Sequence, residues 1–424
     1  MALMADLATE LARRGLLHDA TPGLEERLQT GPITGYVGFD PTAESLHVGN
    51  LIPMMGLAWL DRAGGTAMAV LGGGTGMVGD PSGKRAERPL LPPEAIAENC
   101  ARMRDQLARF MSRSEAQIEI CDNSEWLEDI RLLDFLRDTG KHFTLSYMLQ
   151  KESVKGRMEL GLSFTEFAYM LVQAYDYWHL HRTRGCELQM GGSDQWGNIT
   201  AGIELVARKE QAKVHGLVFP LLTTASGTKF GKSEAGNIWL DAERTSPYRF
   251  YQFWLNTDDQ DVERLLKLFT FMPLEKIDAL AASHHERPAA RIAQRALAED
   301  VTTRIHGPET TAAVVQASRI LFGDSEIRET SPAAFEVLAG ELAVARVPVS
   351  TVQQGLSVVE ALTTVGLASS KADARRGIRG GGFSVNGDKI AKEDDVLSQT
   401  CVLADRYILL QKGRKTHALL IIEG

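Results

Sequence analysis

Two short motifs, far apart in the chain, combine residue types that handle phosphate. Thr42–Asn50 reads TAESLHVGN and contains a histidine, a glycine and an amide side chain, while Lys229–Ser233 reads KFGKS and carries two lysines. Imidazole, amide and backbone N–H groups can bind phosphate or ribose, and lysines can neutralise the charge of a departing pyrophosphate. Either motif alone could arise by chance. Together, in this order, they predict nucleotide chemistry.

The first motif is expected where a strand turns into a helix. An apolar run, Ile33–Phe39, precedes it, and an apolar-periodic stretch, Leu51–Leu60, follows it. Backbone N–H groups and the side chains of His47 and Asn50 would then face a ligand at the start of the helix. Gly49 would let adenine lie against bare backbone, because any side chain there would block it.

A second candidate site is a polar stripe on an otherwise apolar helix. Tyr169, Gln173 and Asp176 are spaced i, i+4 and i+7, so they lie on one face of that helix. Buried polar groups are costly unless they are paired. The stripe therefore indicates either a hydrogen-bonded structural network or a site for a small polar ligand.

The glycine-rich stretch Gly72–Gly76 and the pair Gly83-Lys84 invite comparison with a Walker phosphate loop. That motif needs a glycine five positions before Gly83 and a serine or threonine after the lysine, whereas this chain has Val78 and Arg85. We therefore interpret the glycines as allowing the end of a strand to approach bound ligands closely.

The elements that must position these residues alternate between strand and helix up to about residue 225. The expected strands are Ile33–Phe39, Thr66–Leu71, Gln117–Cys121 and Glu187–Met190, and the expected helices include Val48–Ala63, Pro93–Phe110 and Phe164–His181. This alternation predicts an α/β fold with a doubly wound parallel sheet, whose ligands lie at the carboxyl ends of the strands. The candidate residues fall at those ends.

The rest of the chain has a different organisation. Residues from about 241 to 323 show helical patterns without strands, and the prolines of Ser331-Pro332 and Val347–Ser350 indicate a linker. Further on, Asn386-Gly387 between two apolar runs predicts a hairpin. We expect domains at residues 1–235, 236–330 and 355–424, with a linker at 331–354.

The length and composition are sufficient for several hydrophobic cores, but they say little about function. The 424 residues are 44% hydrophobic, and the net charge of −9 means that any RNA binding must come from local patches. Residues 356–424 carry ten Lys/Arg against eight Asp/Glu. The four cysteines form no Cys-x-x-Cys pair, so neither a disulfide framework nor a zinc site is indicated. Without a signal peptide or a long apolar run, we expect a cytoplasmic protein that does not enter a membrane.

Four stretches resemble the bacterial-type tyrosyl-tRNA synthetases, a family of class I aminoacyl-tRNA synthetases: Tyr36–Thr42, Thr75–Lys84, Gly191–Asn198 and Lys229–Ser233. The resemblance covers essentially the whole chain. It implies a Rossmann-like catalytic domain, an α-helical anticodon-binding domain and a small α+β C-terminal RNA-binding domain. It also implies a reaction in which ATP activates L-tyrosine as tyrosyl-adenylate, and the tyrosyl group then passes to the 3′-terminal ribose of tRNA(Tyr).

The resemblance also implies roles for the candidate residues. The phenolic hydroxyl of tyrosine would meet Tyr36 and Asp176, and its ammonium group would meet Asp80, Tyr169 and Gln173. Asp194 and Gln195 would take the ribose and carboxylate region. The catalytic groups around the phosphates would be Thr42, His47, Asn50, Lys84, Arg88, Lys229, Lys232 and Ser233. The ATP contacts would be Gly38, Asp40, His47, Gly49, Asn50, Gly192, Asp194 and Lys232.

These assignments suit the chemistry, because displacement at the α-phosphorus of ATP needs fixed positive donors more than an acid or a base. Asn50 stands where many relatives have a second histidine, and its amide can still donate a hydrogen bond to ribose. Val37 and Pro53 stand where some relatives have small polar residues, and neither side chain can donate there.

The implied partners are tRNA(Tyr), L-tyrosine and ATP. Mg²⁺ is expected with ATP, whereas no permanently bound cofactor and no zinc are expected. A homodimer is implied, with Phe164 and Met148 at its interface. The candidate tRNA contacts are cations on one side of a short helix, Lys371, Arg375, Arg376 and Arg379.

Two other function classes share some of these features. A metabolic adenylyltransferase has the histidine motif and a nucleotide-binding sheet, but such enzymes are usually shorter and need no C-terminal RNA module. A non-catalytic RNA-binding protein descended from a synthetase, such as a splicing factor, is disfavoured because His47, Lys229, Lys232 and Asp176 are all present. A relative acting on tryptophan is disfavoured by the pair Tyr36 and Asp176.

Overall fold

The structure is a computed structural model that describes residues 4–82, 90–151, 154, 155, 158, 161–223, 230–233, 236–322 and 327–424, with only the backbone of residues 232 and 233. The chain forms two compact units. The first comprises Met1–Ser246 and Gln252–Ile305, and the second comprises Pro247–Tyr251 and His306–Gly424. Among the helices of these described ranges, none is long and apolar enough to cross a membrane.

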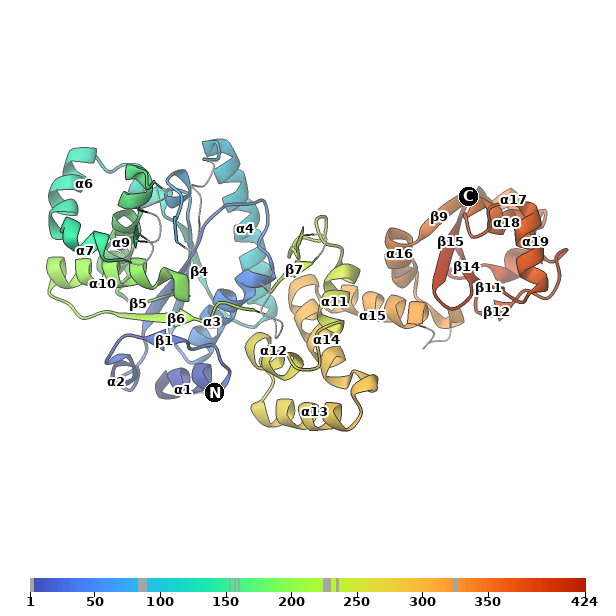
Figure 1. Ribbon diagram of the computed structural model, residues 1–424, viewed down its shortest axis with the longest axis horizontal. Coiled ribbons are helices and arrows are strands. Elements are labelled where there is room, and N and C mark those ends of the chain that lie inside the picture. The colour runs from blue at the N-terminus through green and yellow to red at the C-terminus, as the bar shows by residue number, and fades with distance from the viewer. Residues whose placement is uncertain are drawn as a thin grey trace. The chain divides into compact units, whose positions relative to one another are not determined.

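A six-stranded sheet with the order β1-β6-β5-β2-β3-β4 forms the centre of the first unit (Figure 1). Its strands are β1 Asp19–Ala20, β2 Thr34–Phe39, β3 Thr66–Leu71, β4 Glu119–Asp122, β5 Cys186–Gly192 and β6 His215–Phe219. Strands β2 to β6 run parallel, and only the short β1 pairs antiparallel, with β6. The strand order reverses between β2 and β5, so the predicted doubly wound sheet is confirmed and has its switch point there.

Helices cover both faces of this sheet. On one face, α9 (Phe164–Arg184) and α10 (Trp196–Glu210) share a buried cluster with Met68 and Val70 of β3. Helix α3 (Leu51–Arg62) packs on the other face, which alternate strand residues reach. Gly35 permits this close approach, because a Cβ there would lie 2.8 Å from Cδ2 of Leu60.

The remaining helices of the first unit are α1 Leu7–Arg13, α2 Leu24–Leu28, α4 Pro93–Arg113, α5 Ser124–Leu127, α6 Leu132–Asp138, α7 Leu145–Leu149, α12 Val262–Phe269, α13 Leu274–Glu286 and α14 Ile292–His306. Of these, α1, α2, α4, α6 and α7 lie around this core, whereas α12, α13 and α14 form a group beside it (Figure 1). Helix α11, Pro247–Leu255, is divided between the two units. The all-helical pattern predicted for residues 241 to 323 is confirmed over the described positions.

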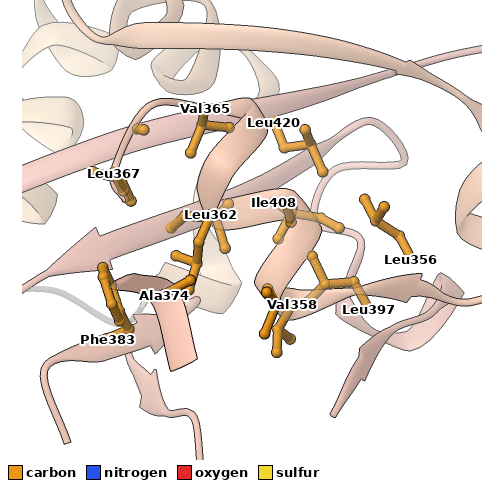
Figure 2. Close-up of a cluster of buried hydrophobic side chains, with 14 of the residues drawn as sticks. Leu356, Val358, Leu362, Val365, Leu367, Ala374, Phe383, Leu397, Ile408 and Leu420 are labelled. Carbon is orange, nitrogen blue, oxygen red and sulfur yellow. The ribbon is translucent and has the colours of Figure 1, made fainter. Parts of the chain in front are cut away.

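The second unit contains a five-stranded sheet with the order β12-β11-β14-β15-β9. The strands are β9 Ala343–Pro348, β11 Phe383–Val385, β12 Asp388–Lys389, β14 Tyr407–Lys412 and β15 Thr416–Glu423, and β10 Leu356–Ser357 pairs separately with β13 Val396–Leu397. Its helices are α15 Pro308–Phe322, α16 Pro332–Glu341, α17 Val349–Gln353, α18 Val358–Thr364 and α19 Lys371–Arg379. Figure 2 shows the core, where Leu362, Ala374 and Phe383 gather with Ile408 and Leu420.

The predicted hairpin is present at the predicted turn. β11 and β12 pair antiparallel around Asn386 and Gly387, whose φ values are 50° and 88°. Two consecutive positive φ values define a type I′ turn, for which Asn-Gly is the preferred sequence.

Residues 331–354, expected to be a linker, form regular structure instead. Ser331 caps α16 by accepting a hydrogen bond from the backbone N–H of Ala334 at 3.2 Å, and Pro332 occupies the first helical position, where proline is favoured. β9 then pairs in parallel with β15. The prolines therefore mark the start of a helix and the end of a strand, and this segment belongs to the second unit.

Candidate active site

A cleft of about 630 Å³ opens at the switch point between β2 and β5. This is where parallel α/β sheets bind ligands. Sequence-predicted residues lining it are Tyr36, Gly38, Asp40, Thr42, His47, Asn50, Asp80, Tyr169, Gln173, Asp176, Gly192, Asp194 and Gln195. The fold therefore brings thirteen of the candidates, from five separate stretches of chain, to one cleft. Their individual roles stay predictions.

Helix α9 carries the deepest carboxyl group of the cleft. Its start is fixed by a capping box between Ser163 and Glu166, and it ends at Gly185 in the left-handed conformation. Asp176 on this helix is buried, and its two carboxyl oxygens accept hydrogen bonds from Asn123 Nδ2 at 2.9 Å and from Trp126 Nε1 at 2.7 Å. Burial raises the pKa of Asp176 to about 7, and the two donors oppose that rise.

The hydroxyl group of Tyr36 lies in the same buried region. It makes no hydrogen bond to any residue that the structure describes, although its side chain is 2% exposed. The ring packs edge-on against Tyr177, with centroids 5.6 Å apart. A buried hydroxyl without a partner costs free energy, so this end of the cleft is built to receive a polar group of a ligand.

Polar side chains from three elements converge on Asn198, a buried residue of α10. Its amide nitrogen lies within hydrogen-bond distance of four acceptors: Gln173 Oε1 at 3.0 Å, Gln195 Oε1 at 3.1 Å, Asp80 Oδ1 at 3.3 Å and Ser82 Oγ at 3.3 Å. An amide has only two N–H donors, so acceptors outnumber them. The surplus of acceptors suits a ligand ammonium group, which brings three donors.

Asp80 is held by further donors in this cluster. Its Oδ2 accepts from Gln195 Nε2 at 2.6 Å, and its Oδ1 accepts from the backbone N–H of Ser82 at 3.0 Å. Tyr169 lies on the same wall and donates to Asp40 Oδ2 at 3.4 Å. The polar stripe on α9 therefore forms a hydrogen-bonded network and also lines the cleft, and its role in binding a small polar ligand stays a prediction.

His47 begins the helical turn at the opposite end of the cleft. Its Nδ1 accepts from the backbone N–H of Gly49 at 3.0 Å, and Asn50 Oδ1 accepts from the backbone N–H of His47 at 2.9 Å. When Nδ1 accepts, the neutral imidazole carries its proton on Nε2. His47 is thereby set as a hydrogen-bond donor, which suits an anionic ligand.

Gly49 is required by this cap and is not a lining residue of the cleft. A Cβ on Gly49 would lie 2.7 Å from Cε1 of His47 and displace the ring. The missing side chain lets the imidazole fold back onto the helix start. The contact of Gly49 with adenine stays a prediction.

Three predicted cations, Lys84, Arg88 and Lys229, lie outside the described residues. For Lys232 and Ser233 the backbone is described, and it forms β7, which pairs with β8 (Gly236–Asn237). In the described part of the chain, no three His, Cys, Asp or Glu side chains group as metal ligands would.

The candidate tRNA cations lie exposed on α19 of the second unit. Each one has an acidic neighbour: Lys371 with Glu360 at 3.9 Å, Arg375 and Arg379 with Glu393 at 3.8 and 2.5 Å, and Arg376 with Asp373 at 3.2 Å. The positive field of this helix is therefore weaker than the spacing of its cations implies.

Four residues in or next to the cleft had no role assigned from the sequence: Asn123 and Gln189 line it, and Trp126 and Asn198 are hydrogen-bonded to the lining residues Asp176 and Asp80. Asn123 donates to Asp176 and accepts from the backbone N–H of Gly74 at 2.8 Å, so it ties the glycine-rich stretch to the buried carboxyl group. Gln189 lines the cleft with a buried side-chain oxygen that has no partner among the described residues. Asn198 ends the stretch Gly191–Asn198, which resembles the family, and this was the one sequence signal that could have pointed to it.

Comparison with known proteins identifies the family of this chain. Residues 28–323 match the family model described as "tRNA synthetases class I (W and Y)". The chain belongs to this family. Residues 341–420 also match the "Tyrosine--tRNA ligase SYY-like C-terminal domain". The family and fold class predicted from the sequence are thereby confirmed.

Similar proteins agree with this membership. A protein of Anaeromyxobacter dehalogenans named Tyrosine--tRNA ligase is 60% identical, over 98% of this chain and 99% of the relative. One of the same name from Roseiflexus castenholzii is 45% identical, with the same coverage. The crystal structure of a C-terminally truncated mitochondrial tyrosyl-tRNA synthetase from Aspergillus nidulans superposes with a TM-score of 0.69 at 35% identity, covering 74% of this chain and 94% of that one.

Proposed function

We propose that this chain is a tyrosine–tRNA ligase, which makes tyrosyl-adenylate from L-tyrosine and ATP and then transfers the tyrosyl group to tRNA(Tyr). The observation that carries the choice of amino acid is the buried pair of Tyr36 and Asp176 at one end of the cleft. One hydroxyl without a partner and one carboxyl group with a raised pKa match a phenol, which both donates and accepts. Tryptophan offers an N–H donor and no acceptor.

Tyrosine placed this way would lie with its ammonium group near Asp80 and Gln173 and its carboxylate toward Gln195. The carboxylate oxygen attacks the α-phosphorus of ATP, and the bond to pyrophosphate breaks in line with the attack. His47 donates to the phosphate oxygens as negative charge grows on them. Mg²⁺ would arrive with the nucleotide, because it prefers phosphate oxygens and water as ligands.

The direct test is ATP–pyrophosphate exchange with tyrosine, phenylalanine and tryptophan in parallel, followed by aminoacylation of tRNA(Tyr). Exchange that depends on tyrosine, with little from the other two amino acids, supports the proposal. Equal exchange with tryptophan, or exchange without aminoacylation, would contradict it.

We also propose that the chain works as a homodimer. Apolar side chains on α6, α7 and the start of α9 are exposed in the single chain: Leu132, Leu133, Leu136, Leu145, Leu149 and Phe164. Phe164 is 78% exposed, so it is not ordinary core. Met148, expected beside it, is buried in its own chain's core and is not free to form the interface.

Phe164→Asp should convert the dimer to a folded monomer, because a charge would enter an apolar interface. Analytical ultracentrifugation reads the mass, and far-ultraviolet circular dichroism reports folding. An unchanged dimer would exclude Phe164 as an anchor.

Contact with tRNA is proposed for α19. Arg375→Gln with Arg379→Gln should weaken tRNA binding and its salt dependence, because fewer phosphate contacts release fewer counterions. Tyrosine activation should stay unchanged. Equal loss of aminoacylation and exchange would mean that α19 is structural.

A further inference from the structure

The backbone that follows the KFGKS motif is joined to the histidine motif by a ladder of hydrogen bonds. The N–H of Ile238 donates to the carbonyl of Gly231 at 3.1 Å, and the N–H of Val48 donates to the carbonyl of Ile238 at 3.0 Å. The N–H of Leu240 donates to the carbonyl of Leu46 at 2.8 Å. We call this ladder the seam. It places His47 opposite Trp239 as a bridge pair.

The seam leaves no space for a side chain at Gly231. This residue has φ of +82°, and a Cβ there would lie 2.5 Å from Cγ2 of Val48. The backbone at Gly231 therefore rests directly on Val48 of the histidine motif. A shift of one motif must shift the other.

The side chains of His47, Trp239, Arg244 and Glu44 contact one another in that order across the seam, and we call this set the circuit. The ring of Trp239 meets the imidazole of His47 edge-on, with centroids 6.1 Å apart at 61°. The guanidinium carbon of Arg244 lies 4.2 Å from the centroid of Trp239, and its Nη1 donates to Glu44 Oε2 at 3.1 Å. Glu44 belongs to the same motif as His47, so the circuit starts and ends within it.

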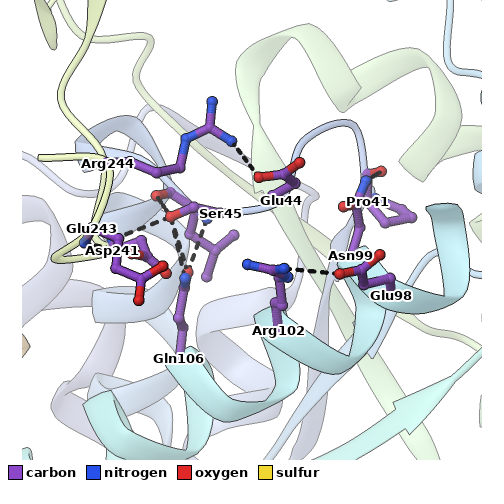
Figure 3. A network of polar contacts seen from close by, with 11 residues as sticks. Pro41, Glu44, Ser45, Glu98, Asn99, Arg102, Gln106, Asp241, Glu243 and Arg244 are labelled. Atoms are coloured by element: carbon purple, nitrogen blue, oxygen red, sulfur yellow. Dashed lines mark hydrogen bonds and ion pairs between the residues drawn. The ribbon is translucent and has the colours of Figure 1, made fainter.

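Two polar contacts hold the backbone beneath this circuit in place (Figure 3). Gln106 of α4 accepts from the backbone N–H of Leu46 at 2.9 Å, and Ser45 Oγ accepts from the backbone N–H of Asp241 at 3.2 Å. Figure 3 shows Arg244 reaching Glu44 above these residues. The backbone on both sides of the circuit is therefore held, and the ring of His47 is held both by the N–H of Gly49 at Nδ1 and by its contact with Trp239.

The circuit contributes little to global stability. The side chains of Arg244 and Glu44 are 35% and 59% exposed, and an ion pair this exposed to water adds little to the free energy of unfolding. The Arg244–Glu44 pair differs from other surface ion pairs in its location beside His47, the proposed hydrogen-bond donor to ATP, and not in its energy.

We propose that Trp239 and Arg244 are positioning residues for His47, an inference that rests on the proposed function. Trp239 restricts rotation of the imidazole, so the Nε2 proton keeps one direction. Arg244, oriented by Glu44, holds Trp239 by lying over its ring. Because Trp239 lies within the seam, the same contacts align the backbone of the KFGKS motif with His47.

The test compares Trp239→Ala, Trp239→Phe and Arg244→Gln with a matched control. Arg102→Gln is that control, because Arg102 pairs with Glu98 at 2.8 Å on the adjoining helix and is similarly exposed (Figure 3). Stopped-flow kinetics measure the rate of adenylate formation, equilibrium dialysis measures the Kd for tyrosine, and the thermal midpoint reports folding.

We expect Trp239→Ala to lower the rate about tenfold and Arg244→Gln about threefold, with unchanged Kd for tyrosine. Trp239→Phe keeps an edge-on ring and should recover most of the rate. Arg102→Gln should match wild type. An Arg244→Gln variant that equals the control, a Trp239→Phe variant as slow as Trp239→Ala, or a parallel loss in Kd and rate would overturn the proposal.

A readout independent of activity separates this inference from the proposed function. In protein labelled at histidine, the imidazole signals of His47 should shift in Arg244→Gln and not in Arg102→Gln. If wild type lacks tyrosine-dependent exchange, the proposed function fails, and the His47 signals still decide whether Arg244 positions the ring. An unshifted His47 in Arg244→Gln overturns the positioning role.

Discussion

The two ends of the cleft are built in different ways. At the end with Tyr36 and Asp176, side chains are buried, and the carboxyl group of Asp176 accepts hydrogen bonds from Asn123 and from Trp126 of α5. At the end with His47, side chains are half-exposed and are fixed through backbone caps and the seam. From this difference we propose that the buried residues choose the amino acid, whereas the residues nearer the surface stabilise the charge of the transition state.

The largest expected effect is at the buried end. Asp176→Ala should lower kcat/KM for tyrosine by about 100-fold, since a hydrogen bond to a charged group is worth about 1.5–3 kcal/mol and Asn123 and Trp126 would lose their acceptor as well. Most of the loss should appear in tyrosine binding. The measurement is exchange kinetics with tyrosine as the varied substrate, and a loss confined to kcat would contradict the assignment.

The comparable effect at the open end should fall on the rate instead. His47→Asn can keep an acceptor near Gly49 but removes the Nε2 donor, so the activation rate should fall about 100-fold while the Kd for tyrosine stays constant. His47→Gln offers the matched contrast, because it can place a donor near Nε2 but gives up the cap. It should be faster than His47→Asn and less stable by about 1 kcal/mol.

Equal rates for the two His47 variants would show that the cap and not the donor matters. Chemical denaturation, run beside the stopped-flow measurement, reads the stability order. Loss of tyrosine affinity in either variant would mean that the two ends are not separate.

A smaller effect is expected for Asn198, which holds the acceptors proposed for the ammonium group. Asn198→Ala should weaken tyrosine binding about tenfold, because Asp80, Gln173 and Gln195 lose a shared donor. The rate of adenylate formation at saturating tyrosine should change much less. Thr200→Ala, on the same helix, serves as a control, and a reduced rate with normal binding would place Asn198 at the other end of the cleft.

The smallest expected effect is a pH dependence of the free energy of unfolding, which comes from the buried end of the cleft alone. Burial raises the pKa of Asp176 from 3.8 to about 7, so the folded protein keeps this carboxyl group protonated over a range in which the unfolded chain ionises. The free energy of unfolding should therefore fall as pH rises from about 4 to about 7. Subtracting the profile of Asp176→Asn isolates this contribution.

Tyrosine binding should depend on the ionisation of the same Asp176 carboxyl group, but the affinity should rise with pH where the stability falls. A phenol donates more strongly to an ionised carboxylate, so the Kd for tyrosine should fall as pH rises through about 7. Asp176→Asn should remove this dependence. An identical pH profile in the variant would assign the titration to another residue.

The sequence predicted the structure correctly where a short stretch of residues determines its own local conformation. The βα alternation gave the sheet, and Asn386-Gly387 gave the type I′ hairpin, because turn geometry depends on those two residues. It was wrong about residues 331–354, since a proline can begin a helix or end an edge strand as readily as it can mark a linker. β9 is recognisable only from its pairing with β15, which lies far along the chain.

The same limit applies to the site. Tyr36 could be named because it lies in a stretch that resembles the family, and Asp176 because it stands on a polar stripe of an otherwise apolar helix. Asn123 and Asn198 could not, because a short amide acts as a hub only when separate elements bring several partners to it. The packing constraint on Gly49 was missed for a related reason, since it comes from the His47 ring, which folds back onto this residue.

The central claim is that amino-acid choice and transition-state stabilisation occupy separate ends of the cleft. The most direct test is the ratio of kcat/KM for tyrosine over phenylalanine in ATP–pyrophosphate exchange, measured for wild type, Asp176→Asn and His47→Asn. We predict that the ratio falls sharply in Asp176→Asn and stays at the wild-type value in His47→Asn, although both variants are slow. A ratio that is unchanged in Asp176→Asn, or that falls equally in His47→Asn, would contradict the claim.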